Sequence, residues 1–163
     1  MFVKSFGLFW RRDEVDWHPG TGKPFRLLGR CGANRGSIRI ADFREQSGIY
    51  ILYGNHGASY VGLSSNLGNR LKDHLWDQHE DKWDRFSWFG FRKVLKGKDD
   101  EGLCKIGPLA TAAIFTPKRV ISDVEALLIR AMGLNNIRQM DFHQADGWQQ
   151  IKTDEIEKYL AKL

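Results

Sequence analysis

The chain has 163 residues and a formal net charge of +5, and 42% of its residues are hydrophobic and 28% charged. This length is enough for one ordinary domain with a small extension, and the composition excludes a wholly disordered chain. No apolar run approaches the ~18 residues of a membrane-spanning helix and the first residues lack a secretory signal pattern, so we expect a cytoplasmic protein. Cys31 and Cys104 lie far apart and in no metal-binding spacing, which favours reduced thiols.

Positive charge is concentrated toward the front of the sequence. Residues 1–46 contain nine Lys or Arg against five Asp or Glu, a net charge of +4, whereas residues 141–163 contain three against five, a net charge of −2. A basic flank beside a compact domain is typical of proteins that bind a polyanion, and nucleic acid is the expected partner. Arg39 and Arg44 lie in the most basic stretch of this flank and are therefore candidate contacts to a phosphate backbone.

Strand signals become clear before the middle of the chain. Alternating apolar and polar residues predict a short strand at 37–43, after turn-rich loops at 18–24 and 29–36. Residues 48–53 and 59–62 are rich in β-branched and aromatic side chains and flank a Gly-Asn-His-Gly turn cluster. This pattern is typical of a β-hairpin.

An amphipathic helix is expected directly after the hairpin. Asn66 and the two serines before it are preferred N-cap residues, and leucines at positions 67, 71 and 75 form an apolar stripe. Further along, the pattern predicts an aromatic strand at 86–94, a charged loop at 96–108, a helix at 118–132 and an amphipathic helix at about 154–163.

The order strand, strand, helix, strand, helix predicts an α+β fold. We expect a small central antiparallel β-sheet of about three strands, flanked by helices. The expected organisation is a basic N-terminal extension at 1–46, a domain at 47–140 and a C-terminal helical tail at 141–163 that packs on the domain.

Two tyrosines and two basic side chains are placed where they can meet. Tyr50 and Tyr60 share one face of the hairpin if even-numbered residues pair with even-numbered residues. Arg70 and His74 are four residues apart, so they are neighbours on one helix face, about 60° from the leucine stripe. An arginine at this border can bind a phosphate through two hydrogen bonds.

Glu125 is an acidic residue inside the otherwise apolar run at 124–129. A buried carboxylate needs a cation, a metal ion or hydrogen-bond donors, whereas a carboxylate at the exposed edge of the helix needs none. The sequence pattern around Glu125 leaves both alternatives open.

The motifs resemble those of the GIY-YIG nuclease superfamily in order and spacing, over about residues 47–138. Val61 stands where Ile is usual, and the closing Asn follows Glu125 at a shorter distance than is usual. Asn136 fits this last position, an expected substrate contact, more nearly than Asn135. The other matching elements are Gly48-Ile49-Tyr50, Tyr60-Val61-Gly62, Arg70, His74 and Glu125.

The resemblance implies a metal-dependent endonuclease that hydrolyses phosphodiester bonds in DNA. It implies that Glu125 binds a single divalent cation, Mg²⁺ or Mn²⁺, and that Arg70 stabilises charge on the scissile phosphate. A free phenol has a pKa of about 10, so a tyrosine needs nearby positive charge to act as a base near neutral pH. Which of Tyr50, Tyr60 and His74 is the base stays open.

Two alternatives share the same motifs. One is a nuclease that acts on RNA, and the other is a non-catalytic module that binds nucleic acid. The presence of every expected catalytic residue type favours an enzyme. A zinc site from His74, His79 and His143 has little support, because the usual short spacing between ligands is missing. The sequence indicates neither the structure of the substrate nor the oligomeric state.

Overall fold

The protein is described from a computed structural model, over residues 2–32, 38–109, 116–133, 142 and 145–163. The helices in these ranges are α1 (Leu67–Asp73), α2 (Pro117–Met132) and α3 (Ile156–Leu160), with 3₁₀ turns η1 (Arg12–Glu14) and η2 (Thr153–Glu155). None of them is both long and apolar enough to cross a membrane. The strands are β1 (Ser5–Arg11), β2 (Leu28–Cys31), β3 (Arg39–Asp42), β4 (Gly48–Gly54), β5 (Gly57–Ser64), β6 (Arg85–Gly90), β7 (Arg92–Lys98), β8 (Cys104–Leu109) and β9 (Asp146–Gln150).

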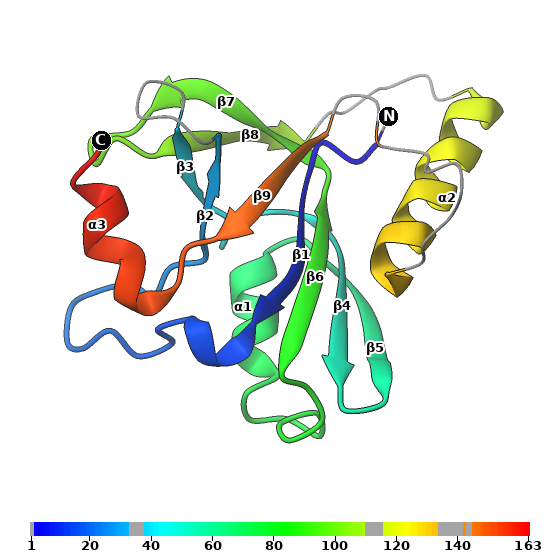
Figure 1. Ribbon diagram of the computed structural model, residues 1–163, viewed down its shortest axis with the longest axis horizontal. Coiled ribbons are helices and arrows are strands. Elements are labelled where there is room, and N and C mark those ends of the chain that lie inside the picture. Colours follow the sequence, from blue (N-terminus) through cyan, green and yellow to red (C-terminus); the bar gives the residue numbers. More distant parts are fainter. Residues whose placement is uncertain (1, 33–37, 110–115, 134–141, 143–144) are drawn as a thin grey trace.

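These strands form one mixed sheet in the order β5-β4-β6-β1-β9-β2-β3-β8-β7 (Figure 1). The pairs β1–β9 and β3–β8 are parallel, and the other pairs of neighbours are antiparallel. The fold is α+β, as expected, but the expected small antiparallel sheet of about three strands is wrong, because the described residues form nine strands. Both outer segments of the chain contribute, since β1, β2 and β3 precede residue 47 and β9 follows residue 140.

The strand β1 shows why the sheet was underestimated. Phe6 and Leu8 pack in one hydrophobic core, whereas Trp10 is buried in the other. Because apolar side chains occupy both faces, β1 lacks the alternation of a half-buried strand. Its partner β9 lies near the opposite end of the chain, so no local turn signal marks the pairing.

The region after β6 also differs from expectation. The single strand expected at 86–94 is two strands, β6 and β7, with a break at Phe91. The expected loop at 96–108 contains the end of β7 and most of β8. The strand β7 lies at the edge of the sheet and its end is exposed, and exposed edge strands carry polar residues that resemble loops in sequence. The strand β8 contains Gly107 and Pro108, which are typical of turns. The strand β2 also extends into the glycine-rich stretch expected to be a loop at 29–36, because it ends at Cys31.

The elements around the candidate site follow the sequence closely. The hairpin β4–β5 and the helices α1 and α2 are confirmed near the expected bounds. Asn66 caps α1, because its side-chain oxygen accepts a hydrogen bond of 2.9 Å from the Asn69 backbone N–H. The last helix is shorter than expected and comprises η2 and α3.

The two faces of strand β4 are covered by different helices (Figure 1). Tyr50 and Leu52 pack in the core that includes Leu67 and Leu71 of α1. Ile51 and Tyr53 point the other way and pack in the core that includes Ala126 and Ala131 of α2. Because side chains alternate along a strand, α1 and α2 lie on opposite faces of the sheet.

Candidate active site

The register of the hairpin brings the two tyrosines together. Tyr50 of β4 pairs with Gly62 of β5, and Leu52 pairs with Tyr60, so even-numbered residues oppose even-numbered residues. Both phenol rings therefore lie on the α1 face, with their centroids 6.0 Å apart. The expectation that they share a face is confirmed.

The glycines of the two triplets are required by close packing. A Cβ atom at Gly62 would lie 2.3 Å from the Tyr50 hydroxyl oxygen, so the absence of a side chain there makes room for the phenol. A Cβ atom at Gly48 would lie 2.0 Å from the Phe89 carbonyl oxygen in β6. The triplets thus serve two purposes: they supply the phenols, and they let β5 and β6 approach β4.

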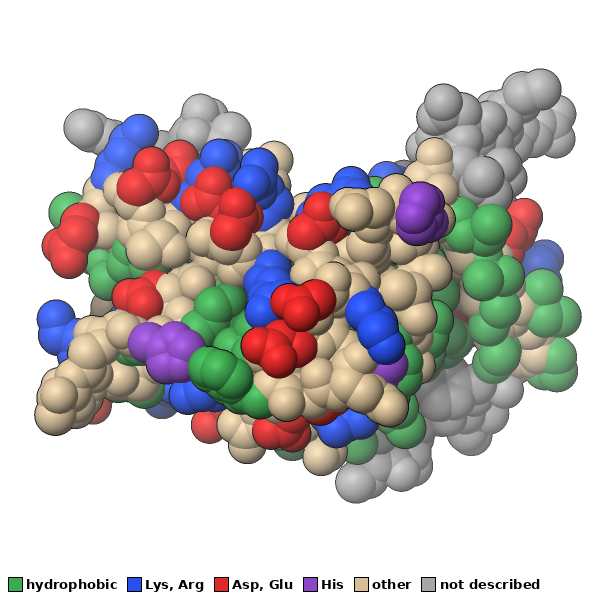
Figure 2. Space-filling model, turned by 90° about the horizontal axis from the view of Figure 1, so that it is seen from below, with side chains coloured by type: hydrophobic (Ala, Val, Ile, Leu, Met, Phe, Trp, Pro, Cys, Tyr) green, Lys and Arg blue, Asp and Glu red, His purple; other side chains and the backbone are tan. Residues whose placement is uncertain are grey.

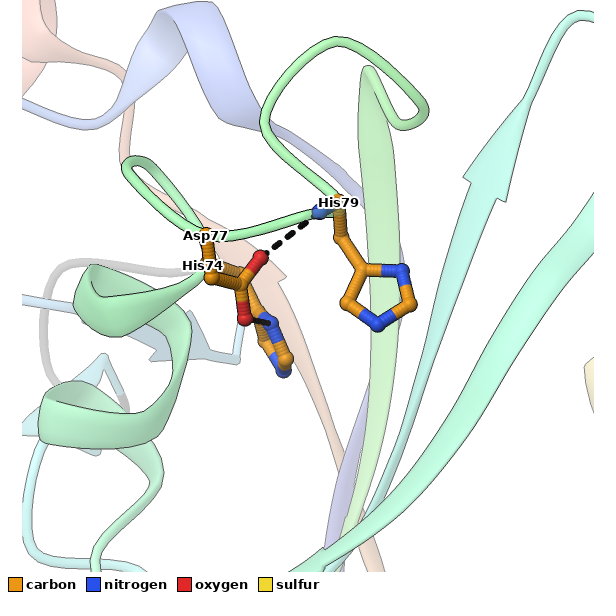
Figure 3. A group of neighbouring side chains, drawn as sticks. All are labelled: His74, Asp77 and His79. Carbon is orange, nitrogen blue, oxygen red and sulfur yellow. Dashed lines mark hydrogen bonds and ion pairs between the residues drawn. The ribbon is translucent and has the colours of Figure 1, made fainter.

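His74 lies at the C-terminal cap of α1 and is completely buried. Its Nε2 atom is 2.7 Å from the hydroxyl oxygen of Tyr50, and its Nδ1 atom is 2.7 Å from Oδ2 of Asp77. The second carboxylate oxygen of Asp77 accepts a hydrogen bond of 2.7 Å from the backbone N–H of His79 (Figure 3). The result is a continuous hydrogen-bonded chain from Tyr50 through His74 to Asp77, which we call the Tyr50–His74–Asp77 chain.

The partners of His74 determine where its proton is. An ionised carboxylate can only accept hydrogen bonds, so Asp77 assigns the proton to Nδ1 and leaves a lone pair on Nε2. The Tyr50 hydroxyl then donates to Nε2. Burial lowers the pKa of His74, which keeps the ring neutral near pH 7. Partial burial alone would raise the pKa of Asp77, but its hydrogen bonds to His79 and His74 lower it overall.

Arg70 supplies positive charge beside the phenols. Hydrogen bonding to Tyr60, and then to Tyr50, raises the pKa of its guanidinium group. Burial raises the pKa of Tyr50 to about 12, and the interaction with Arg70 offsets only part of this shift. Tyr50 is therefore protonated near neutral pH, and positive charge from Arg70 does not convert it to a phenolate in the free protein.

Two further rings complete the wall of the site. The Tyr60 ring lies 4.5 Å from the His79 ring and 5.2 Å from the His74 ring, measured between centroids. Tyr50, Tyr60, Arg70 and His74 are thus brought together, as expected from their spacing. His79 joins the same group.

Glu125 is not part of this group. It is exposed on α2, whose residues Ala126 and Ala131 pack on the sheet face opposite to Tyr50. The buried carboxylate of the helix is instead Asp123, which accepts a hydrogen bond of 2.7 Å from the backbone N–H of Phe2. Of the two alternatives left open for Glu125, the structure shows the exposed one.

The expected substrate contacts have different surroundings. Arg39 forms a salt bridge of 2.7 Å with Asp146 and lies over the Trp148 ring. Arg44 forms a salt bridge of 2.7 Å with Asp42, and its backbone packs against Gly68 in the first turn of α1. Both guanidinium groups are about one-third exposed. Asn135, Asn136 and His143 lie outside the described residues.

One possible metal-binding group occurs within the described residues. Potential ligand atoms of His74, Asp77 and His79 all lie within 4.8 Å of one another. However, Nδ1 of His74 and both oxygens of Asp77 are already engaged in hydrogen bonds, so a metal ion here would have to replace them. Mg²⁺ prefers oxygen ligands and keeps several waters, and this nitrogen-rich group does not fit that preference.

Sequence reasoning missed the role of Asp77 and the position of His79. Asp77 has no part in the sequence-based prediction, whereas in the structure it binds His74, three residues before it. The signal that was available is the i,i+3 spacing of His74 and Asp77 at the end of a helix, which allows side-chain contact. That spacing is common in sequences and becomes informative only once His74 is known to be buried.

Comparison with known proteins agrees with the motif analysis over part of the chain. Residues 46–101 match the family model of the GIY-YIG catalytic domain, which confirms the resemblance for that segment. The match includes β4, β5, α1 and the Tyr50–His74–Asp77 chain, and it ends before Glu125. Neither a curated protein nor a solved structure matches the chain.

Proposed function

From the GIY-YIG catalytic domain matched at residues 46–101, we propose that this protein is a metal-dependent endonuclease that hydrolyses phosphodiester bonds in DNA. The observation that carries the proposal is the Tyr50–His74–Asp77 chain beside Arg70. This arrangement places a proton acceptor, a proton relay and a phosphate-binding cation in one group of side chains. Those are the functions that activation of water at a phosphodiester requires.

The proton steps follow from the protonation states of the free protein. As water attacks phosphorus, it gives a proton to the Tyr50 oxygen, while the Tyr50 proton passes to Nε2 of His74. Tyr50 stays neutral throughout, which agrees with its raised pKa. His74 is the base in this scheme, and Asp77 stabilises the imidazolium that forms.

Charge at the phosphate is balanced by Arg70. Its guanidinium donates hydrogen bonds to the non-bridging oxygens, which gain negative charge as the new P–O bond forms. The bond to the leaving oxygen breaks at the same centre, and that oxygen takes a proton from solvent. Tyr60, which interacts with Arg70, orients the guanidinium toward the substrate.

We assign the single divalent cation, Mg²⁺ or Mn²⁺, to Glu125. Glu125 is exposed and forms no salt bridge within the part of the chain that the structure describes, and such a carboxylate suits a hard ion that retains most of its water. A divalent ion would supply Lewis-acid stabilisation of phosphate charge, but α2 packs on the sheet face opposite to Tyr50, so no step of the proposed reaction is assigned to an ion at Glu125. Asn136, Arg39 and Arg44 are the proposed contacts to the rest of the substrate, and each arginine would have to exchange a partly buried salt bridge for a phosphate.

One observation favours a second function, a module that binds nucleic acid without cutting it. Glu125 belongs to α2, which packs on the sheet face opposite to Tyr50, so the residue proposed to hold the cation is separated from the proposed base. A protein with this arrangement can bind phosphate through Arg70 and still lack the electrophile.

The test is cleavage of supercoiled plasmid by purified protein with Mg²⁺ or with EDTA. We expect cleavage that requires the metal and is lost in Arg70→Ala and in Glu125→Ala. Lys72→Ala is the matched control, because it removes a cation from the same helix, where Lys72 lies over the Phe25 ring. Branched DNA, single-stranded DNA and RNA are tested in parallel. Binding of these substrates with no cleavage of any of them supports the non-catalytic module instead.

A further inference from the structure

A cavity lies beside the proposed active site, since one residue of its wall is hydrogen-bonded to His74. It is a cavity of about 730 Å³ formed by η1, the segment after it, the segment after α1 and the start of β6. Its volume is within the range of pockets that bind small molecules. We call it the Trp76 pocket. Its lining includes Arg12, Trp17, His18, Trp76, Glu80 and Trp83.

The Trp76 pocket is joined directly to the Tyr50–His74–Asp77 chain. The indole N–H of Trp83, in the wall of the pocket, donates a hydrogen bond of 3.3 Å to the backbone carbonyl of His74. Trp76 itself lies between His74 and Asp77 in the sequence. The wall of the pocket therefore contacts the backbone of the residue that holds Tyr50.

The pocket presents an aromatic face to solvent. Trp76 is 68% exposed, whereas Trp17 and Trp83 are buried. The His18 ring contacts the Trp76 ring edge-on, with centroids 6.1 Å apart. A large aromatic ring left in water at the rim of a cavity is a recurrent feature of binding sites.

The charges of the pocket cancel rather than accumulate. It contains three arginines and three carboxylates, and Arg11 and Arg85 form salt bridges with Asp13 and Asp84. Figure 2 shows this side of the molecule, on which basic and acidic side chains are interspersed. A groove that follows a phosphate backbone needs an excess of positive charge, so the lining is not that of a phosphate track.

Arg12 is the least neutralised cation of the pocket. It donates hydrogen bonds to the backbone carbonyls of Glu80 and Trp83 and lies 4.9 Å from the Trp83 ring centroid. It forms no salt bridge with any carboxylate that the structure describes. Its flat guanidinium group, held in place by backbone, adds a second surface on which a ring can stack.

We propose that the Trp76 pocket binds an unstacked nucleobase of the substrate strand, next to the phosphate that is cut. A nucleobase is flat and uncharged and carries both donors and acceptors on its edge, which matches an exposed indole surrounded by arginines and carboxylates. This inference rests on the proposed function, since it takes the substrate to be a nucleic acid. It assigns a substrate class: strands with an accessible, unpaired base.

The expected preference for single strands over duplex follows from the free energy of base stacking. A base inside a duplex must leave its stack and its partner before it can enter the pocket, whereas a base in a single strand is already accessible. Tight binding of single strands relative to duplex is the expected consequence.

The test measures the affinity of the whole protein for three labelled oligomers in EDTA, where no cleavage can occur. They are a single DNA strand, the matching duplex, and an abasic chain of the same length that keeps only sugar and phosphate. We expect Trp76→Ala to weaken binding of the single strand by about tenfold or more and to leave binding of the abasic chain unchanged. Leu109→Ala, which removes another exposed apolar side chain outside the pocket, is the matched control.

Three results would overturn the proposal. In the first, Trp76→Ala binds the single strand as tightly as the wild type does. In the second, Trp76→Ala loses as much affinity for the abasic chain as for the single strand. In the third, the wild-type protein binds none of the oligomers. Because the assay needs no catalysis, it is independent of the nuclease test. Base-dependent binding through Trp76 together with no cleavage would support the pocket and contradict the proposed hydrolase.

Discussion

The two faces of β4 differ in how their functional residues are assembled. On the α1 face, Tyr50, His74 and Asp77 form a closed chain in which every polar atom between them has a partner. On the α2 face, Glu125 is exposed, and its neighbours Val124 and Leu128 are exposed apolar residues. The α1 face therefore holds a hydrogen-bonded chain of titratable side chains in the free protein, whereas on the α2 face the Glu125 carboxylate is exposed.

Sequence distance explains the difference. The residues of the α1 face come from a hairpin and the helix that follows it, so local register and helix geometry bring them together. Glu125 comes from a helix in a distant part of the chain, and its position depends on how that helix packs. The positions of the α1-face residues are therefore determined by local geometry, whereas the position of Glu125 is determined by tertiary packing.

The largest expected effect on cleavage comes from removing the Tyr50 hydroxyl group on the α1 face, compared with removal of a hydroxyl group on the α2 face. Tyr50→Phe deletes the relay and should lower the cleavage rate by roughly 10²- to 10⁴-fold. Tyr53→Phe is its matched control, since the Tyr53 hydroxyl donates to the Ala131 carbonyl on the α2 face. The control should cleave normally and lose about 1 kcal/mol in free energy of unfolding. Equal cleavage by the two variants would remove the distinction between the faces.

Asp77→Asn tests whether the Asp77 carboxylate determines which ring nitrogen of His74 carries the proton. Two N–H groups, from His74 and His79, donate to Asp77, and an amide can accept only through its single oxygen. We expect the reaction to be slower by roughly 10²- to 10⁴-fold, because the wrong histidine tautomer becomes populated. Nitrogen NMR of the imidazole reports the tautomer without any reaction. Asp73→Asn, an exposed change on the same helix, should alter neither measurement.

Gly62→Ala should destabilise the α1 face selectively. A methyl group there would meet the Tyr50 hydroxyl at 2.3 Å, so we expect a loss of roughly 1–3 kcal/mol in free energy of unfolding. Gly97→Ala provides the comparison, because no atom lies within 4 Å of the added carbon. Chemical denaturation measures both, and similar stabilities would contradict the packing described here.

The smallest expected effect is that of pH on stability. The pKa of His74 is lower in the folded protein than its ordinary value of 6.5, mainly because of burial. Below pH 6.5 the unfolded chain therefore binds a proton before the folded one does, and stability falls as the pH decreases through this range. Unfolding measured at several pH values, with an NMR titration of His74, tests this. A His74 pKa at or above 6.5 would contradict it.

The success of sequence reasoning was uneven, for physical reasons. The hairpin, the Asn66 cap and the meeting of Tyr50 with His74 depend on short-range periodicity, which a sequence displays directly. The sheet beyond them depends on pairing between distant segments, such as β1 with β9, which leaves no local pattern. The exposed edge strand β7 has the polar composition of a loop, and its neighbour β8 contains Gly107 and Pro108, which are typical of turns.

Within the site, too, properties that depend on tertiary packing could not be predicted from the sequence. That Glu125 is exposed and Asp123 buried reflects the rotation of α2 on the sheet, which two acidic residues in one helix do not disclose. The role of Asp77 depended on the burial of His74, a property of the folded molecule.

The most direct test of the central claim is a double-mutant cycle on DNA cleavage, with the wild type, Tyr50→Phe, Asp77→Asn and the double variant. If Tyr50, His74 and Asp77 act as one chain, Asp77→Asn should slow the wild type but cause little further loss once Tyr50 is Phe. Independent losses that multiply in the double variant would contradict this account. So would a folded wild-type protein that leaves every DNA and RNA substrate intact in the presence of Mg²⁺.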